Sequence, residues 1–117
     1  MQDEIKEVTL TRTGQPPLRF KGVLLGVGST RGQSSTRWTE VSIHRTSGGK
    51  FVACVARRTQ WENEHDHVDA KASSTAAEVI GWLGGSEGTL GPASQKAVEQ
   101  AAQSDPAFAA AWQERVD

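Results

Sequence analysis

The spacing of apolar side chains changes once along the chain, near residue 73, and this change limits the possible folds more than any other feature. From residue 5 to about residue 72, apolar residues alternate with polar ones or form short runs between turn residues, which is typical of β-strands. After residue 73 they recur every three or four residues, which is typical of amphipathic helices. A block of strands followed by a block of helices predicts an α+β fold.

The first block predicts about five strands, at residues 5–10, 18–27, 38–45, 51–56 and 65–72. Pro16-Pro17 should separate the first two strands, because proline cannot donate to a strand ladder. Gly22 and Gly26 inside the second strand indicate a bulge or the close approach of another backbone. Residues 29–36 lack apolar side chains and predict a mobile loop.

Alternation also predicts which side chains of these strands share a face. Val23, Leu25 and Val27 should lie together on one face of the second strand, and Val41 and Ile43 should face inward from the third. Ser47-Gly48-Gly49 should form a tight hairpin, because glycine tolerates the positive φ that such a turn needs. The continuous apolar run at residues 51–56 favours a central position in the sheet.

The second block predicts two or three helices. Thr75-Ala76-Ala77-Glu78 matches a capping box, and the apolar stripe that follows consists of Ala76, Val79, Ile80 and Leu83. Gly84-Gly85 should end this first helix, and a second should run from Pro92 to about Gln103. Asp105-Pro106 should open a third, with Phe108, Trp112 and Val116 on one face and Trp112 in the core.

We therefore expect one domain over residues 1–117, because 117 residues is a common size for a single domain. Residues 1–72 should form an antiparallel meander of about five strands, rich in basic residues. Residues 73–117 should form the acidic helical half, packed on one face of the sheet.

The charge is sorted along the chain, although its total is only −1. Residues 1–58 hold ten basic and four acidic side chains, a balance of +6, and residues 59–117 hold three basic and ten acidic ones, a balance of −7. A basic sheet surface that meets an anionic partner is one interpretation. The other is that the basic strands and the acidic helices neutralise each other within the fold, and both remain open.

Six residues of the basic half are the candidate partner-binding residues. Arg31 and Arg37 flank the polar loop, and Trp38 shares a strand face with Glu40, Ser42 and His44. An exposed tryptophan among arginines suits a protein interface, where both residue types are enriched, although Trp38 could equally pack beneath a helix. The complete set is Arg31, Arg37, Trp38, Arg45, Arg57 and Arg58.

Residues 62–69 hold the densest group of metal-capable side chains. On a strand, His65, His67 and Asp69 would share one face and could form an open divalent-metal site. The alternative is a solvated outer strand face, which polar residues occupy in any case. Beyond this group we expect no cofactor.

Several other classes of protein and site are not expected from the sequence. Cys54, the single cysteine, lies inside an apolar run, which predicts a buried and unreactive thiol. The apolar runs are too short for a membrane span, and the acidic N-terminus lacks the basic start of a signal peptide. We therefore expect a cytoplasmic protein with no membrane partner.

The segment Arg37-Trp38-Thr39-Glu40-Val41-Ser42-Ile43-His44-Arg45-Thr46, followed by Gly49-Lys50-Phe51-Val52, resembles a pattern in small uncharacterised proteins of phages and mobile elements in GC-rich bacteria. The resemblance covers about residues 18–80. It implies a setting in which small non-enzymatic inhibitors of host defence, such as anti-CRISPR proteins, are common. It implies no catalytic residue.

Our first functional expectation is a small non-enzymatic binding protein, an inhibitor or adaptor, that acts on a protein or ribonucleoprotein through its basic strands. The first alternative is a small nucleic-acid-binding regulator that uses the same surface. The second is a divalent-metal-dependent hydrolase at His65, His67 and Asp69. The chain could act as a monomer or, if a basic sheet meets an acidic helix of a second copy, as a homodimer.

Overall fold

A computed structural model describes residues 4–33 and 36–113 of the chain. The described residues form five strands, β1 (Lys6–Arg12), β2 (Gln15–Ser29), β3 (Arg37–Thr46), β4 (Phe51–Thr59) and β5 (His67–Ser73). Three helices follow, α1 (Ala76–Gly84), α2 (Pro92–Ser104) and α3 (Pro106–Ala111), with short 3-10 turns η1 (Arg31–Gln33) and η2 (Gly85–Glu87). The strands form one antiparallel sheet in sequence order, so the predicted α+β meander is confirmed.

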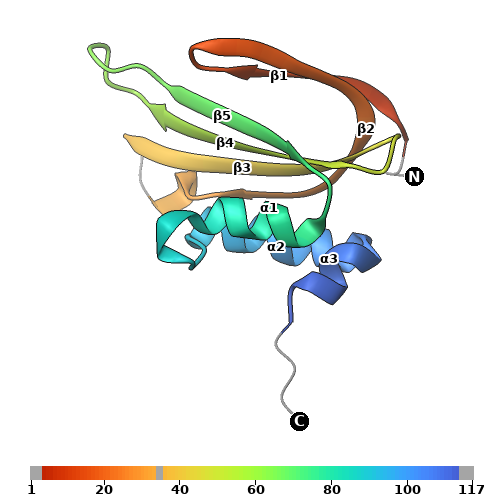
Figure 1. Ribbon diagram of the computed structural model, residues 1–117. Helices are drawn as coiled ribbons and strands as arrows, with labels where there is room; N and C mark the ends of the chain where they lie inside the picture. The colour runs from red at the N-terminus through yellow and green to blue at the C-terminus, as the bar shows by residue number, and fades with distance from the viewer. Residues whose placement is uncertain (1–3, 34–35, 114–117) are drawn as a thin grey trace.

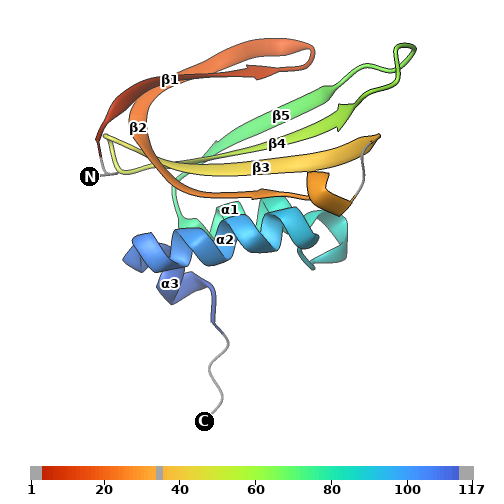
Figure 2. The same cartoon turned by 180° about the vertical axis from the view of Figure 1, so that it is seen from behind.

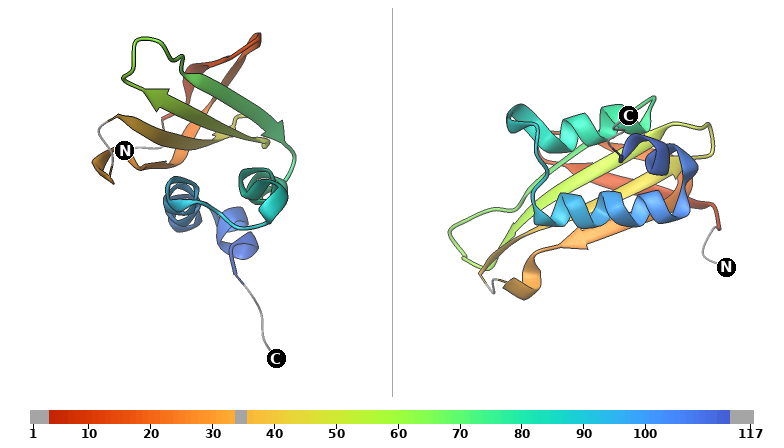
Figure 3. Two further views of the ribbon diagram at one scale, coloured as in Figure 1. Left: turned by 90° about the vertical axis from the view of Figure 1, so that its left-hand side faces the viewer. Right: turned by 90° about the horizontal axis from the view of Figure 1, so that it is seen from below.

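The sheet is strongly curled. Figure 1 shows β2 bending, so that its first half lies beside β1 above the sheet and its second half lies beside the helices. The bend coincides with a β-bulge between Leu24 and Gly26. The curl brings the β1–β2 turn onto β5, where Thr13 N donates to Val68 O at 2.8 Å and Val68 N donates to Thr13 Oγ1 at 2.9 Å. The sheet is therefore closed at one point into a partial barrel (Figure 3, left).

Two predictions about β2 were wrong. Pro16-Pro17 does not separate two strands but lies inside β2, in the half of the strand that pairs with β1 and has no β3 partner. Proline is tolerated there because a strand with one neighbour needs fewer amide donors. Val27 is not on the face of Val23 and Leu25, because the bulge shifts the alternation, and its side chain is 44% exposed.

Helices α1 and α2 cover the outer face of the curled sheet, and α3 packs against them on the same side, so the predicted packing of the helices on one face is confirmed (Figures 1 and 2). The core between the layers holds Val41 and Ile43 of β3, together with Val79 of α1, Val98 of α2 and Phe108 of α3. Figure 3 (right) shows α1 and α2 lying side by side across the strands. The predicted inward positions of Val41 and Ile43 are thus confirmed.

Helix α2 lies unusually close to β2, because glycine occupies the contact positions. A Cβ added to Gly26 would lie 2.2 Å from the Ala97 oxygen, and one added to Gly28 would lie 2.0 Å from the Ala93 oxygen. The predicted close approach of a backbone at Gly26 is confirmed, and Gly28 has the same role. Alanines on the facing side of α2 complete this tight contact.

The helix boundaries follow local signals. Thr75 and Glu78 form both hydrogen bonds of the predicted capping box, and α1 ends at Gly84 with Gly85 at positive φ. Trp112 was expected in the core but follows the end of α3 and is 37% exposed. Val116 lies outside the described residues. No helix of the described chain is long and apolar enough to cross a membrane.

A second, smaller apolar layer lies inside the curl. Val52, Cys54 and Ala56 of β4 point away from the helices and are buried. Phe20, in the first half of β2, covers this layer and meets His44 edge-on, with ring centroids 5.4 Å apart. The buried Cys54 thiol agrees with the sequence-based expectation, and burial raises the pKa of this thiol.

Candidate functional site

The structure brings five of the six candidate partner-binding residues to one end of the sheet. The register of β3 with β4 places Trp38 opposite Arg58 and Thr39 opposite Arg57. Arg37 starts β3, and Arg31 lies in the adjacent turn η1. Arg45 lies at the other end of β3, about 26 Å away along the strand, and does not join this group.

Arg45 instead holds two layers of the fold together. Its Nη1 donates to Asp105 Oδ2 at 2.9 Å, and Asp105 is only 3% exposed. Asp105 also caps α3, by accepting a hydrogen bond from Ala107 N at 2.8 Å. The contacts of Arg45 are therefore those of a structural residue.

Arg37, the first residue of β3, pairs with a carboxylate from the turn after β4. Its Nε donates to Glu64 Oε1 at 3.0 Å, and its Nη2 also donates to Glu64 Oε2. Thr59 Oγ1 donates to the same carboxylate at 2.7 Å. The hydrogen bonds from Arg37 and then Thr59 lower the pKa of Glu64 from 4.5 to about 2.

Trp38 is the centre of a continuous polar chain on the inner side of the curl. The Arg31 guanidinium lies 4.4 Å from the centroid of the Trp38 ring, a cation–π contact. Trp38 Nε1 donates to Glu40 Oε2 at 2.9 Å, and Arg58 Nε donates to Glu40 Oε1 at 3.0 Å. We call Arg31, Trp38, Glu40 and Arg58 the Trp38 surface. Its indole is half-buried and held in one orientation by these contacts.

The hydrogen bonds within the Trp38 surface stabilise the charged forms of Glu40 and Arg58. The hydrogen bond from Trp38, followed by the one from Arg58, lowers the pKa of Glu40, although burial acts in the opposite direction. The bond to Glu40 raises the pKa of Arg58, whose Nη1 also reaches Asp66 Oδ2 at 3.3 Å. Glu40 therefore stays ionised at neutral pH and fixes both of its donors.

An open groove of about 580 Å³ begins beside the Trp38 surface. Glu40 and Arg58 form its polar rim, while Leu10, Val27 and Ala56 supply apolar lining. Val27 reaches this side only because of the bulge in β2. The Trp38 surface is thus continuous with exposed apolar area, an arrangement found at protein-binding sites.

Arg57 and Arg58 are adjacent in sequence and point to opposite faces of β4. Arg58 belongs to the Trp38 surface, whereas Arg57 faces the helix side and lines a separate pocket. Within residues 4–33 and 36–113, Arg57 makes no ion pair and no side-chain hydrogen bond. The six candidates therefore belong to four different environments: the Trp38 surface, the Arg37–Glu64 pair, the Arg45–Asp105 contact and the pocket beside Arg57.

The three candidate metal ligands are not all placed as alternation predicted. Strand β5 begins at His67, so His65 lies in the preceding turn and does not share a strand face with His67 and Asp69. Asp69 Oδ1 accepts a hydrogen bond from Ala70 N at 2.9 Å. The described part of the chain contains no group of three side chains able to hold a metal ion.

Sequence reasoning placed Glu40 on the strand face of Trp38 but did not pair any carboxylate with the candidate arginines. Glu40 was recognisable, since it lies two residues after Trp38 and so on the same strand face. Glu64 and Asp66 come from the acidic turn that follows β4, and the predicted β4–β5 hairpin places that turn beside the end of β4.

Comparison of the chain with protein-family models, curated proteins and solved structures finds no match.

Proposed function

We propose that this protein is a small non-enzymatic binding protein that recognises another protein, free or within a ribonucleoprotein, through the Trp38 surface. The observation that carries this proposal is the cation–π contact of Arg31 with Trp38, beside an indole that Glu40 already fixes. Tryptophan and arginine are the residue types most enriched among interface hot spots. A side chain held in its binding conformation loses less entropy when a partner binds.

The local charge favours a protein over nucleic acid as the partner. At this end of the sheet, four arginines (Arg31, Arg37, Arg57 and Arg58) lie among three carboxylates (Glu40, Glu64 and Asp66) that pair with two of them. Nucleic-acid affinity depends on unneutralised positive charge that can displace counterions from phosphates. A nearly balanced surface with an aromatic anchor and an apolar groove suits the mixed character of a protein interface.

The resemblance of the segment at residues 37–52 to small phage and mobile-element proteins suggests one specific form of this function. In that form the protein inhibits a host-defence complex. Such an inhibitor needs a rigid surface that blocks its target and no catalytic group. The single-domain fold with a tightly held aromatic anchor is compatible with that role.

Affinity capture from a lysate of the native host tests the proposal. The bait is the tagged protein, and the test variant is Trp38→Ala, compared with Trp112→Ala. Trp112 is also partly exposed but lies at the end of α3, so it matches the chemical change without touching the Trp38 surface. Circular dichroism and thermal unfolding establish that both variants are folded.

We expect a defined protein or protein complex to bind the wild type and the Trp112→Ala variant. Titration calorimetry with the purified partner should show at least a tenfold weaker affinity for Trp38→Ala, as expected for loss of an interface anchor. Equal affinity of the two variants would refute the choice of surface. Salt-sensitive binding of mixed-sequence DNA or RNA that depends on Arg31 and Arg58 would instead favour a nucleic-acid-binding regulator.

A further inference from the structure

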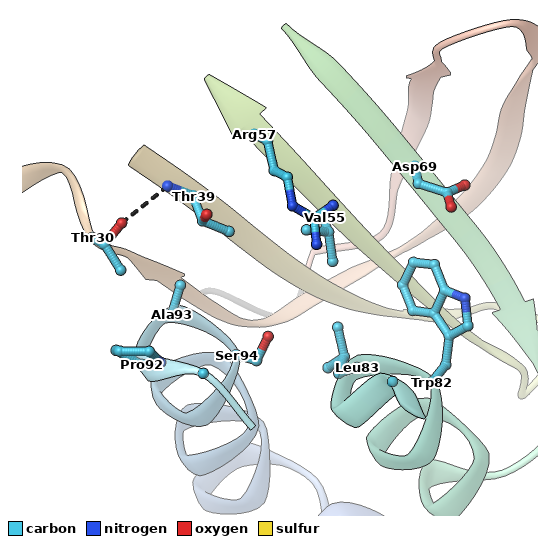
Figure 4. Close-up of a pocket in the computed structure, with 12 residues that line it drawn as sticks. Thr30, Thr39, Val55, Arg57, Asp69, Trp82, Leu83, Pro92, Ala93 and Ser94 are labelled. Carbon is cyan, nitrogen blue, oxygen red and sulfur yellow. Dashed lines mark hydrogen bonds between the residues drawn. The ribbon is translucent and has the colours of Figure 1, made fainter. Parts of the chain in front are cut away.

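A second site lies on the opposite side of the sheet from the Trp38 surface. It is a pocket of about 380 Å³ between β4, α1 and the start of α2 (Figure 4). Its wall includes Val55 and Arg57 of β4, Trp82 and Leu83 of α1, and Ser94 of α2. We call it the α2 pocket. Its volume is within the range of small-molecule sites.

Ser94 contributes to the pocket a hydroxyl that has no hydrogen-bond partner among the described residues. The residue is only 9% exposed, and its side chain points into the α2 pocket (Figure 4). In the portion of the chain that the structure describes, the Ser94 hydroxyl forms no hydrogen bond with another protein group. The hydroxyl opens into the pocket, so it can donate to or accept from a ligand there.

The start of α2 adds further hydrogen-bond donors to the same wall. This helix has 13 residues, and its N-cap residue, Gly91, has no side chain to cap it. Pro92 has no amide hydrogen, and the amides of Ala93 and Ser94 precede the first helical hydrogen bond. Backbone donors at a helix N-terminus, aligned with the helix dipole, favour a negatively charged group.

Arg57 provides the positive charge of the pocket. It extends along β4 past Val55 toward the helices, as Figure 4 shows, and has no carboxylate partner among the described residues. Arginine can donate two parallel hydrogen bonds to an oxyanion. A guanidinium without a carboxylate partner, a hydroxyl without a protein partner and a helix N-terminus therefore line one pocket.

The remaining walls limit the ligand further. Val55, Trp82 and Leu83 offer apolar area for a ring or a branched aliphatic group. Asp69 also lines the pocket, and its carboxylate opposes a doubly charged anion more strongly than a singly charged one. From these features we infer that the α2 pocket binds a small organic carboxylate with an apolar or aromatic body.

Three phenyl compounds separate the contributions to binding. Phenylacetate carries one negative charge, phenyl phosphate carries up to two, and 2-phenylethanol carries none. Titration of the full chain, followed by NMR at the Ser94 amide and the Trp82 indole, reports binding at the pocket itself. We expect phenylacetate to shift both signals saturably and to bind at least tenfold more tightly than either other compound.

Each contrary result overturns a specific part of the inference. If none of the three compounds shifts the NMR signals of Ser94 and Trp82 at millimolar concentration, the α2 pocket is not a binding site for such ligands. If 2-phenylethanol binds as tightly as phenylacetate, the ligand does not need a negatively charged group. If phenyl phosphate binds more tightly than phenylacetate, the pocket does not prefer a singly charged anion. Failure of the Trp38 surface leaves these results unaffected, because Trp38 and Arg57 lie on opposite faces of the sheet.

Three variants assign the binding to the named groups. Arg57→Gln should weaken phenylacetate binding at least tenfold, and Ser94→Ala should weaken it about fivefold. Arg19→Gln is the matched control, because Arg19 is an exposed arginine in the half of β2 that pairs with β1. Asp69→Asn should improve the binding of phenyl phosphate relative to phenylacetate. Unchanged affinity in Arg57→Gln and Ser94→Ala would show that these groups do not form the site.

Discussion

Arg45 and Asp105 are sixty positions apart in sequence, yet Arg45 Nη1 lies 2.9 Å from Asp105 Oδ2. The contact joins the end of β3 to the start of α3. Asp105 uses its other oxygen to accept from Ala107 N, so one carboxylate both caps a helix and fastens it to the sheet. Phe108, the next residue of α3 after Ala107, packs edge-on against Phe51 of β4, with ring centroids 5.2 Å apart. This aromatic contact also joins α3 to the sheet.

Removal of the Asp105 carboxylate should therefore destabilise the fold. Asp105→Ala loses the cap and leaves Arg45 without its partner, which should lower the free energy of unfolding by about 1–3 kcal/mol. Asp105→Asn keeps a capping oxygen and should lose less than half of that amount. Urea unfolding at pH 7 measures both values. Equal losses in the two variants would contradict the capping role. The ion pair itself should add little, because Arg45 is 46% exposed.

This junction also shows which parts of the fold could be predicted from sequence. The cap at Asp105-Pro106 was predictable, because a capping interaction involves only neighbouring residues. The pairing with Arg45 was not, since it depends on where α3 lies on the sheet. The error at Trp112 has a related origin: the apolar spacing continues beyond Ala111, but the helix does not.

The same distinction applies to the candidate site. Strand alternation correctly placed Trp38 and Glu40 on one face. The sequence analysis put Arg57 and Arg58 in one partner-binding set, but β4 continues beyond Ala56 and the two arginines point to opposite faces. It could not show that Val27 joins the groove, because the bulge between Leu24 and Gly26 changes the face without an unambiguous sequence signal. Nor could it identify the α2 pocket, which is formed by residues from β4, α1 and α2 that are distant in sequence.

Two glycine substitutions, one at the close contact of α2 with β2 and one on the exposed side of α1, should have opposite effects on stability. Gly28→Ala would place a Cβ 2.0 Å from the Ala93 oxygen, so the helix must move, and we expect a loss of at least about 2 kcal/mol in unfolding free energy. Gly81→Ala, on the exposed side of α1, meets no atom within 4 Å and should stabilise by roughly 0.5–1 kcal/mol. Thermal and urea unfolding measure both. A neutral Gly28→Ala would contradict the described approach of α2.

The Arg37–Glu64 pair should be visible in an acid titration. The pKa of Glu64 is lowered to about 2, so the carboxylate stays ionised while ordinary glutamates become protonated near pH 4.5. A lowered pKa means that the stabilisation from this pair is present above pH 4.5 and is lost as the pH falls toward 2. NMR of the side-chain carboxyl carbon should show the Glu64 midpoint moving upward in Arg37→Gln. An unchanged midpoint would assign the shift to Thr59.

His44 predicts a loss of stability at mildly acidic pH. It is 9% exposed, its Nδ1 finds no hydrogen-bond partner among the described residues, and burial lowers its pKa below 6.5. The unfolded chain therefore takes up a proton at this residue at a higher pH than the folded chain does. The unfolding free energy should thus be greatest above pH 6.5 and fall as the pH decreases through the folded-state pKa.

The variant His44→Leu separates this effect from the general acid sensitivity of the fold. It removes both the titration and the unpartnered nitrogen, so it should reduce the slope of stability between pH 7 and pH 5. At pH 8 it should leave the unfolding free energy unchanged or raise it by about 1 kcal/mol, because the unpartnered Nδ1 atom of His44 is removed. The control is His67→Gln, at the exposed start of β5, which removes an imidazole from the surface. If the slope survives in His44→Leu but disappears in His67→Gln, the pH dependence comes from the surface of β5, and the buried imidazole of His44 is not its source.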